Sequence, residues 1–317
     1  MTATTVAHTG NPPPAGAHGP LPASSPALAE RPAPVERVGV VGCGVMGSGL
    51  AEACARPGID VLVAVSSERS GTAGRSRIRA SLDRAVDKGR LTGTQRDERL
   101  DRISFTRDLA DFADRQLVVE AVTEDEPTKL KLFAQLDTVV RDDAAVLASN
   151  TSSLPVAKLA RAADRPGRVL GMHFFNPVPV LSLVEITPSL LTDDRVTARA
   201  EAFVTDVLGK EVVRSKDRPG FVVNALLVPY LLSAVRMLES GHATAEDIDR
   251  GMVLGCAHPM GPLRLADLIG LDTLAAVAAG LYEETKEPLY SAPVLLSRMV
   301  DGGLYGKKSG RGFYRYR

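Results

Sequence analysis

A histidine and a glutamate stand where the chain could bring an imidazole and a carboxylate together. His173 and Glu185 lie in two apolar stretches that flank a proline turn, and a turn centred near Pro179 is equally far from both. Residues paired directly opposite each other in two strands have Cβ atoms about 5 Å apart. A carboxylate raises the basicity of a neighbouring imidazole, which suits a general base. The alternative is a histidine with a purely structural role, to which the glutamate supplies a hydrogen bond.

Hydroxyl and amide side chains gather at a second place, in the segment Ser149 to Ser153. The segment follows an apolar strand and precedes a helix opened by Pro155. In an open α/β sheet, groups that follow a strand in this way lie in the crevice where ligands bind. Plain capping of the next helix by Ser152 or Ser153 is the alternative.

Three glycines predict a phosphate-binding turn. Gly42, Gly44 and Gly47 form G-x-G-x-x-G between an apolar run at 38–41 and a helical stretch at 50–55. In this pattern the glycines allow a tight turn, close approach of a pyrophosphate and packing of the helix on its strand. Free N–H groups and the positive end of that helix would then face the phosphates. The alternative is a glycine-rich turn in an unrelated α/β unit.

Strands and helices alternate over the first part of the chain. We predict strands at 38–41, 60–65, 103–105, 116–121, 145–149 and 168–174, and helices at 74–89, 126–140 and 155–163. This alternation predicts an α/β fold with a Rossmann-type doubly wound parallel sheet, followed after Arg218 by helices only. The expected organisation is a tail at 1–34, a dinucleotide-binding domain at 35–217 and an all-helical domain at 218–317.

Composition narrows the possible partners and compartment. Lys and Arg together number 38, as do Asp and Glu, so charge favours neither nucleic acid nor a membrane surface. Cys43, Cys54 and Cys256 form no C-x-x-C pair, which predicts reduced thiols in a cytoplasmic protein and no metal site. The tail is rich in Ala and Pro and is expected to be disordered. It has no signal-peptide pattern, and no apolar run is long enough to span a bilayer.

The first helix of the C-terminal region is unusually poor in charge. Its stretch from Leu226 to Leu238 is almost entirely apolar. Such a face forms either the core of the helical domain or a contact between subunits. We expect both roles, and therefore a homodimer.

Five segments together resemble one enzyme family. They are 42–49 (GCGVMGSG), 149–153 (SNTSS), 173–177 (HFFNP), 220–224 (GFVVN) and 306–314 (GKKSGRGFY). In order and spacing they are similar to bacterial 3-hydroxyacyl-CoA dehydrogenases of the 3-hydroxybutyryl-CoA dehydrogenase type. The resemblance runs from about Val35 to the end of the chain, and only the tail lies outside it.

The resemblance implies catalytic roles. His173 would be the general base for the C3 hydroxyl, and Glu185 would orient it. Ser152 and Asn224 would hydrogen-bond the substrate and hold its C3 oxygen near the imidazole.

The resemblance also implies binding contacts. Ser81 and Lys88 match contacts to coenzyme A. The matching cofactor positions are Gly42, Gly44, Val45, Met46, Gly47, Val65, Glu124, Lys129, Ser152, Asn176 and Lys308.

One position departs from the family pattern. An acidic residue at the end of the second strand accepts hydrogen bonds from the adenosine ribose of NAD. Here that position is Val65, followed by Ser66, Ser67, Glu68 and Arg69. NAD is the implied cofactor, and NADP becomes possible.

The sequence therefore predicts an NAD(P)-dependent enzyme that interconverts 3-hydroxyacyl-CoA and 3-oxoacyl-CoA, with short chains preferred. Two alternatives stay open. One is a related dehydrogenase of an acyl-carrier-protein thioester or a hydroxy acid. The other is a cofactor-binding protein without turnover.

Overall fold

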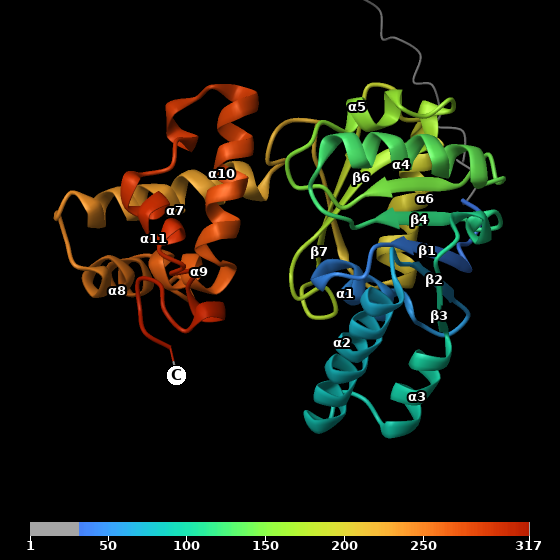
Figure 1. Cartoon of the computed structure of the whole chain (residues 1–317), viewed down its shortest axis with the longest axis horizontal. Helices are drawn as coiled ribbons and strands as arrows, with labels where there is room; N and C mark the ends of the chain where they lie inside the picture. The colour runs from blue at the N-terminus through green and yellow to red at the C-terminus, as the bar shows by residue number, and fades with distance from the viewer. Residues whose placement is uncertain (1–31, 317) are drawn as a thin grey trace, which may run out of the picture. The chain divides into compact units, whose positions relative to one another are not determined.

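The computed structural model describes residues 32–316, all within one compact unit. A sheet with helices on both faces comes first, and a helical region follows (Figure 1). Residues 1–31, which make up most of the predicted tail, lie outside the described residues. The predicted disorder of the tail therefore concerns residues that lie almost entirely outside the described part of the chain.

Eight strands form one sheet in the order β3-β2-β1-β4-β5-β6-β7-β8. Neighbouring strands are parallel except β6 and β7, which are antiparallel, so β7 and β8 run against the rest. The predicted Rossmann-type sheet is confirmed, with this antiparallel addition at one edge. The strands are β1 (Arg37–Val41), β2 (Asp60–Ala64), β3 (Ile103–Thr106), β4 (Leu117–Glu120), β5 (Val146–Ser149), β6 (Val169–Phe174), β7 (Leu183–Pro188) and β8 (Glu211–Arg214).

Helices cover both faces of the sheet, as a doubly wound fold requires. One face packs with α1, α2 and α6 in a common core that includes Leu50, Ile78 and Ala200, and the other packs with α4 and α5. Figure 1 shows α4 and α5 on the side of the sheet opposite α1 and α2. These helices are α1 (Val45–Cys54), α2 (Glu68–Asp87), α4 (Glu126–Val139), α5 (Val156–Arg161) and α6 (Asp194–Ala202).

Helix α2 begins six residues before the predicted Gly74. Ser67 caps it, because its hydroxyl accepts from the N–H of Ser70. Gly74 lies inside the helix, where an added Cβ would be 2.3 Å from Sγ of Cys43. The glycine that suggested a helix start is therefore needed for close packing of α2 on the glycine loop.

Before Arg218, two helices and one strand were not predicted from the sequence. Helix α3 (Gly93–Asp101) has no buried residue, so no apolar period marks it, although Thr92 and Gln95 form a capping box at its start. Helix α6 and strand β8 were also missed. Strand β8 is short and has no buried residue, so it carries none of the alternation that indicates a strand.

The C-terminal region is helical, as predicted. Its core includes Leu231, Leu263 and Leu281. The sequence from Thr244 to Asp247 (TAED) resembles a capping box, and Thr244 does cap α8 by accepting from the N–H of Asp247. The helices are α7 (Val223–Glu239), α8 (Ala245–Gly255), α9 (Pro262–Ile269), α10 (Leu271–Thr285) and α11 (Val294–Asp301). Among the described residues, no single helix has the length and apolarity to cross a membrane, and only α9 and α10 taken together, bent by 94°, meet that test.

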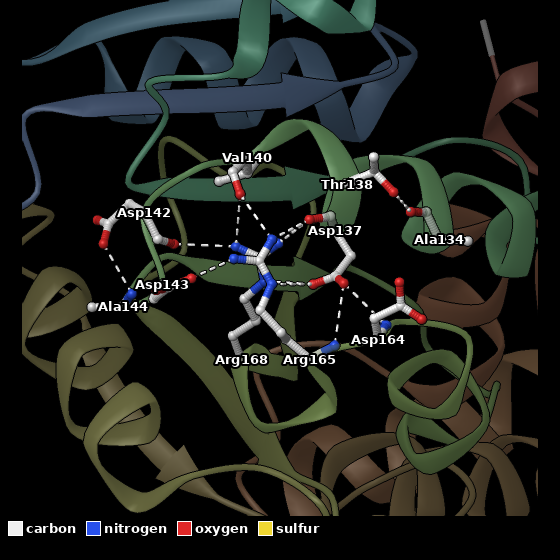
Figure 2. A network of polar contacts seen from close by, with 10 residues as sticks. All are labelled: Ala134, Asp137, Thr138, Val140, Asp142, Asp143, Ala144, Asp164, Arg165 and Arg168. Atoms are coloured by element: carbon white, nitrogen blue, oxygen red, sulfur yellow. Dashed lines mark hydrogen bonds and ion pairs between the residues drawn. The ribbon is translucent and has the colours of Figure 1, made fainter.

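A buried ion pair fixes the start of β6. Arg168 donates from Nε to Oδ1 of Asp137 at 2.7 Å and from Nη1 to the carbonyls of Val140 and Asp142 (Figure 2). The other carboxylate oxygen of Asp137 accepts from the N–H groups of Asp164 and Arg165. The C-terminal end of α4 is thereby joined to the strand that carries His173.

Replacing Arg168 by methionine should lower the free energy of unfolding by about 3 kcal/mol, because buried Asp137 would lose the closer and more buried of its two arginine partners and keep only Arg165, whose Nε lies 3.4 Å away. Urea unfolding followed by circular dichroism measures this loss. Arg161→Met is the matched control, because Arg161 is exposed at the end of α5 and the described residues offer it no ion pair. Equal losses in the two variants would contradict the assigned role.

Candidate active site

Four segments meet at one edge of the sheet. In the strand register Val41 pairs with Glu120, Glu120 with Ser149, and Ser149 with Gly171, so β1, β4 and β5 end together while β6 continues past them to Phe174. The glycine turn, the Ser149 to Ser153 segment and His173 therefore share the carboxyl edge where open α/β sheets bind ligands. This agrees with the location predicted from the sequence.

The glycine turn has the geometry of a phosphate site. Gly42 has φ +95°, and a Cβ on Gly47 would lie 2.1 Å from the carbonyl oxygen of Gly42, so neither position accepts a side chain. A Cβ on Gly44, in contrast, would meet nothing within 4 Å. Helix α1 starts at Val45 without a side-chain cap, and its first N–H groups, including that of Met46, are left for a ligand. The turn fits a dinucleotide pyrophosphate.

Arg77, which sequence reasoning missed, holds this turn from α2. Its guanidinium donates to the carbonyl oxygen of Cys43 and, at 3.2 Å, to the hydroxyl of Ser48. Cys43 is buried, and burial raises the pKa of its thiol, although Ser48 and two arginines oppose the shift. A neutral buried thiol acts as filler rather than as a nucleophile.

His173 and Glu185 face each other across β6 and β7, and this pairing confirms the sequence prediction. Nδ1 of His173 lies 2.7 Å from Oε2 of Glu185, whose side chain has no exposed surface. Oε1 of Glu185 accepts from the N–H groups of Val222 and Val223, each at 2.9 Å. The carboxylate thus joins the histidine to the beginning of α7.

The charge on Glu185 is stabilised by its donors. Burial raises the pKa of this carboxyl. The hydrogen bonds from His173 and from the two backbone N–H groups have a larger, opposite effect, so the pKa is lowered overall. An ionised carboxylate only accepts hydrogen bonds, so Nδ1 of His173 carries a hydrogen and Nε2 is the basic nitrogen. Among the described residues Nε2 has no hydrogen-bond partner, and the Phe175 and Phe221 rings pack against the imidazole.

Ser152 and Asn224, the other two predicted catalytic residues, lie in different parts of the chain. Asn224 lies in the first turn of α7, next to Val223, and Ser152 lies in the loop after β5. Neither side chain has a hydrogen-bond partner within residues 32–316. Capping of α5 by Ser152 or Ser153, the alternative left open by the sequence, is wrong. The first N–H groups of α5 bond to the carboxylate of Asp217.

A chain of charges, buried at Glu120 and Lys129 and exposed at Glu124, supports the loop after β5. Lys129 lies between two carboxylates, 2.9 Å from Glu120 and 2.7 Å from Glu124. Glu124 accepts in turn from the Ser152 N–H and the Thr151 hydroxyl. Burial raises the pKa of Glu124, but Lys129 and the hydroxyl and amide donors outweigh it and lower the pKa overall.

Two further residues of this site were not identified from the sequence. Glu120 ends β4 fully buried, where it also accepts from the hydroxyl of Ser149 at 2.6 Å. A glutamate at the end of an apolar strand was the signal that could have identified it. Asn150 accepts from the N–H of Phe174 and so ties the loop after β5 to the end of β6 beside His173.

The remaining predicted site residues lie apart from this cluster. Ser81 lies on α2 and hydrogen-bonds Glu52, whose pKa burial raises, and Lys88 is the exposed C-cap of α2. Lys308 is paired with Asp272 in the helical region. Asn176 is exposed just after β6, and Val65 directly follows β2. None of the contacts within the described residues joins these side chains to His173.

Comparison with known proteins identifies the class. Residues 37–218 match the 3-hydroxyacyl-CoA dehydrogenase, NAD binding domain, and residues 220–316 match the 3-hydroxyacyl-CoA dehydrogenase, C-terminal domain. The chain therefore belongs to the 3-hydroxyacyl-CoA dehydrogenase family, as the sequence resemblance implied. It is an oxidoreductase of hydroxyacyl-CoA that uses a nicotinamide cofactor.

Individual relatives agree with this family. A 3-hydroxybutyryl-CoA dehydrogenase of Mycobacterium tuberculosis is 60% identical over 282 residues, which cover 89% of this chain and 99% of that protein. The crystal structure of FadB2 from M. tuberculosis matches with a TM-score of 0.89 and 60% identity, over 90% of this chain and 100% of the other. That of (S)-3-hydroxybutyryl-CoA dehydrogenase PaaH1 from Ralstonia eutropha has a TM-score of 0.83 and 43% identity, over 89% and 99%.

Glu185→Gln should destabilise the protein in a pH-dependent way. Because the pKa of Glu185 is lowered on folding from its ordinary 4.5, its ionised form contributes stability above that pH. This contribution is lost as the pH falls through the folded-state pKa. The difference in unfolding free energy between wild type and variant should be about 1.5–3 kcal/mol at pH 7 and shrink below pH ~4.

Urea unfolding at a series of pH values tests this expectation. Glu211→Gln, on exposed β8, is the matched control and should show no such trend. A difference for Glu185→Gln that stays constant into acid would exclude ionised Glu185 as the source of the stability.

Proposed function

We propose that this protein interconverts 3-hydroxybutyryl-CoA and acetoacetyl-CoA, with His173 as the general acid and base. The observation that carries the proposal is the buried His173–Glu185 pair, whose Nδ1 to Oε2 distance is 2.7 Å. It leaves Nε2 basic at the carboxyl edge that also holds the glycine turn. The names of the similar proteins support the short-chain substrate.

The proposed chemistry uses few groups. A bound nicotinamide supplies the hydride acceptor or donor at C3 of the substrate. In oxidation Nε2 of His173 takes the proton of the C3 hydroxyl, and in reduction the imidazolium returns it. Glu185 holds the ring in place and stabilises its charge. Ser152 and Asn224, whose side chains are otherwise without partners, donate to the C3 oxygen.

We further propose how the chain holds its cofactor. Gly42, Gly44 and Gly47, with the first N–H groups of α1 at Val45 and Met46, bind the pyrophosphate. Glu124, Lys129 and Asn176 lie around the nicotinamide half, together with Ser152 and Lys308. The buried position of Lys129 between two carboxylates supports a fixed charge at this point.

The proposed coenzyme A contacts lie on α2, at Ser81 and Lys88. Residues 35–217 form the proposed cofactor domain and residues 218–317 the proposed substrate and dimerisation domain. Exposed apolar residues on α7, including Leu226 at 71% exposure and Met237, support a homodimer through this helix. We propose that the enzyme works in the cytoplasm.

Steady-state reduction of acetoacetyl-CoA, with NADH and NADPH in parallel, tests the function. Saturable oxidation of the nicotinamide that depends on acetoacetyl-CoA is expected. The matched acyl-carrier-protein thioester and free acetoacetate should be poor substrates. A preference for either one would favour a related dehydrogenase, and lack of turnover with all three would favour a non-catalytic binding protein.

His173→Gln should lower kcat by about 100-fold or more, the usual contribution of a general acid or base. Cofactor binding, measured by nicotinamide fluorescence, should stay unchanged. Glu185→Gln should lower kcat less, because the imidazole remains. A His173→Gln enzyme that keeps most of its kcat would remove His173 from this role.

Lys88→Ala should raise the KM for acetoacetyl-CoA with little change in kcat, since a contact to the nucleotide end of coenzyme A stabilises ground state and transition state equally. The pantetheine analogue lacks that nucleotide and serves as the matched substrate. Equal effects on both substrates would show that Lys88 has a different role.

Val65 should leave the enzyme with weak cofactor discrimination. Without an acid at this position, the adenosine ribose of NAD loses a hydrogen bond, and the 2′-phosphate of NADP is not repelled. The kcat/KM values for NADH and NADPH should therefore differ by less than about 100-fold. Val65→Asp should weaken NADPH selectively, while Val65→Asn, which adds no charge, should not. Rejection of NADPH by wild type beyond that margin would show that another acid, such as Glu68, binds the ribose.

A further inference from the structure

A cavity of about 480 Å³ opens beside Val65, at the ends of β2 and β3. Val65 lines it together with Gly71 of α2. The N–H of Val65 donates to the carbonyl oxygen of Thr106, so β2 and β3 remain hydrogen-bonded to each other as far as the end of β3. The walls come from the first turns of α2 and from the segment that follows β3. The cavity therefore lies at the same sheet edge as the glycine turn.

Two arginines dominate the charge of this cavity. Arg75 projects from α2 and Arg107 follows β3, and the one carboxylate in the lining is that of Glu68. Neither arginine forms an ion pair with any of residues 32–316, whereas Arg115 and Arg168 do. The guanidinium carbon of Arg75 lies 4.1 Å from the centre of the Phe105 ring, which restricts the side chain. The cavity thus offers two uncompensated guanidinium groups, one of them held in place.

The residues that the sequence suggested for an anion at this point are arranged differently. Ser67 uses its hydroxyl to cap α2 with Ser70, and Arg69 does not line the cavity. The cationic groups that reach it come instead from one turn further along α2 and from the next strand. The position of these two arginines in the sequence, relative to the glycine turn, did not indicate that they would line this cavity.

We infer that this cavity binds the 2′-phosphate of a phosphorylated adenosine, with Arg75 and Arg107 as the residues that recognise it. The inference rests on the proposed cofactor site, which sets the adenosine ribose near the end of β2. Guanidinium groups match phosphate oxygens in charge and in paired hydrogen-bond geometry. With valine at position 65, Glu68 is the one carboxylate in the lining that opposes the phosphate, against two arginines. The N-terminal end of α2 adds a favourable dipole.

The same chemistry has a second source in this enzyme, because coenzyme A carries a 3′-phosphate on its adenosine. The position beside Val65 favours the 2′-phosphate of the dinucleotide. The two sources differ only in the ribose oxygen that bears the phosphate, so isomeric fragments can separate them without any turnover.

Isothermal titration calorimetry on the full chain tests the inference with adenosine 2′,5′-bisphosphate, adenosine 3′,5′-bisphosphate and adenosine 5′-monophosphate. The 2′,5′ isomer should bind about 10-fold more tightly than the monophosphate, the gain expected from charged hydrogen bonds. The 3′,5′ isomer should gain less. Arg75→Ala and Arg107→Ala should each remove most of the 2′ gain and leave the monophosphate unchanged.

Arg79→Ala is the matched control, since Arg79 is exposed one turn beyond Arg75 and does not line this cavity. It should keep the 2′ gain, and Arg75→Lys should keep part of it. Equal binding of the 2′,5′ isomer and the monophosphate by wild type would overturn the inference. So would a stronger gain for the 3′,5′ isomer, or an equal loss in Arg79→Ala. Loss of all three fragments together would instead count against the proposed cofactor site.

Discussion

Glu185 is a buried carboxylate, and the rest of the site depends on how its charge is satisfied. An ionised group in a protein interior is stable only with donors around it, and three reach Glu185: Nδ1 of His173 and the N–H groups of Val222 and Val223. The first comes from β6 and the others from the start of α7. One charge therefore fixes the imidazole and the segment that presents Asn224. The antiparallel pairing of β6 and β7 is what sets Glu185 opposite His173.

A second group of charges, centred on buried Lys129, organises the loop after β5. Lys129 bridges Glu120 and Glu124, and Glu124 receives hydrogen bonds from the loop that carries Ser152. Such buried networks are costly unless every member is paired, and here the polar partners come from β4, α4 and the loop after β5. The loop is thereby held rigidly against the sheet. A rigid loop can present the Ser152 hydroxyl in a fixed direction.

Local sequence signals predicted most of the fold because they reflect local physics. The glycine turn, the strand alternation and the Thr244 cap are each set by the residues involved, and each was found in the structure. The predictions that failed concern elements whose pattern is weak or misleading. Helix α3 buries nothing, and Gly74 looks like a helix start although the packing of Cys43 places it inside α2. Glycine in a helix is unfavourable by itself, so only the tertiary contact explains it.

For the site, the sequence alone determined the His173 and Glu185 pairing, because the two residues lie in apolar strands at equal distances from a proline connection centred near Pro179. It also determined the phosphate turn and, through family resemblance, the enzyme class. The contacts of Glu120, Asn150, Arg77 and Asp217 were decided only by the tertiary structure. Each bonds a group that lies outside its own secondary-structure element, and no periodic pattern records such a contact. The tertiary structure also decided that Arg75 and Arg107 line one cavity, because the sheet order places the end of β3 beside α2.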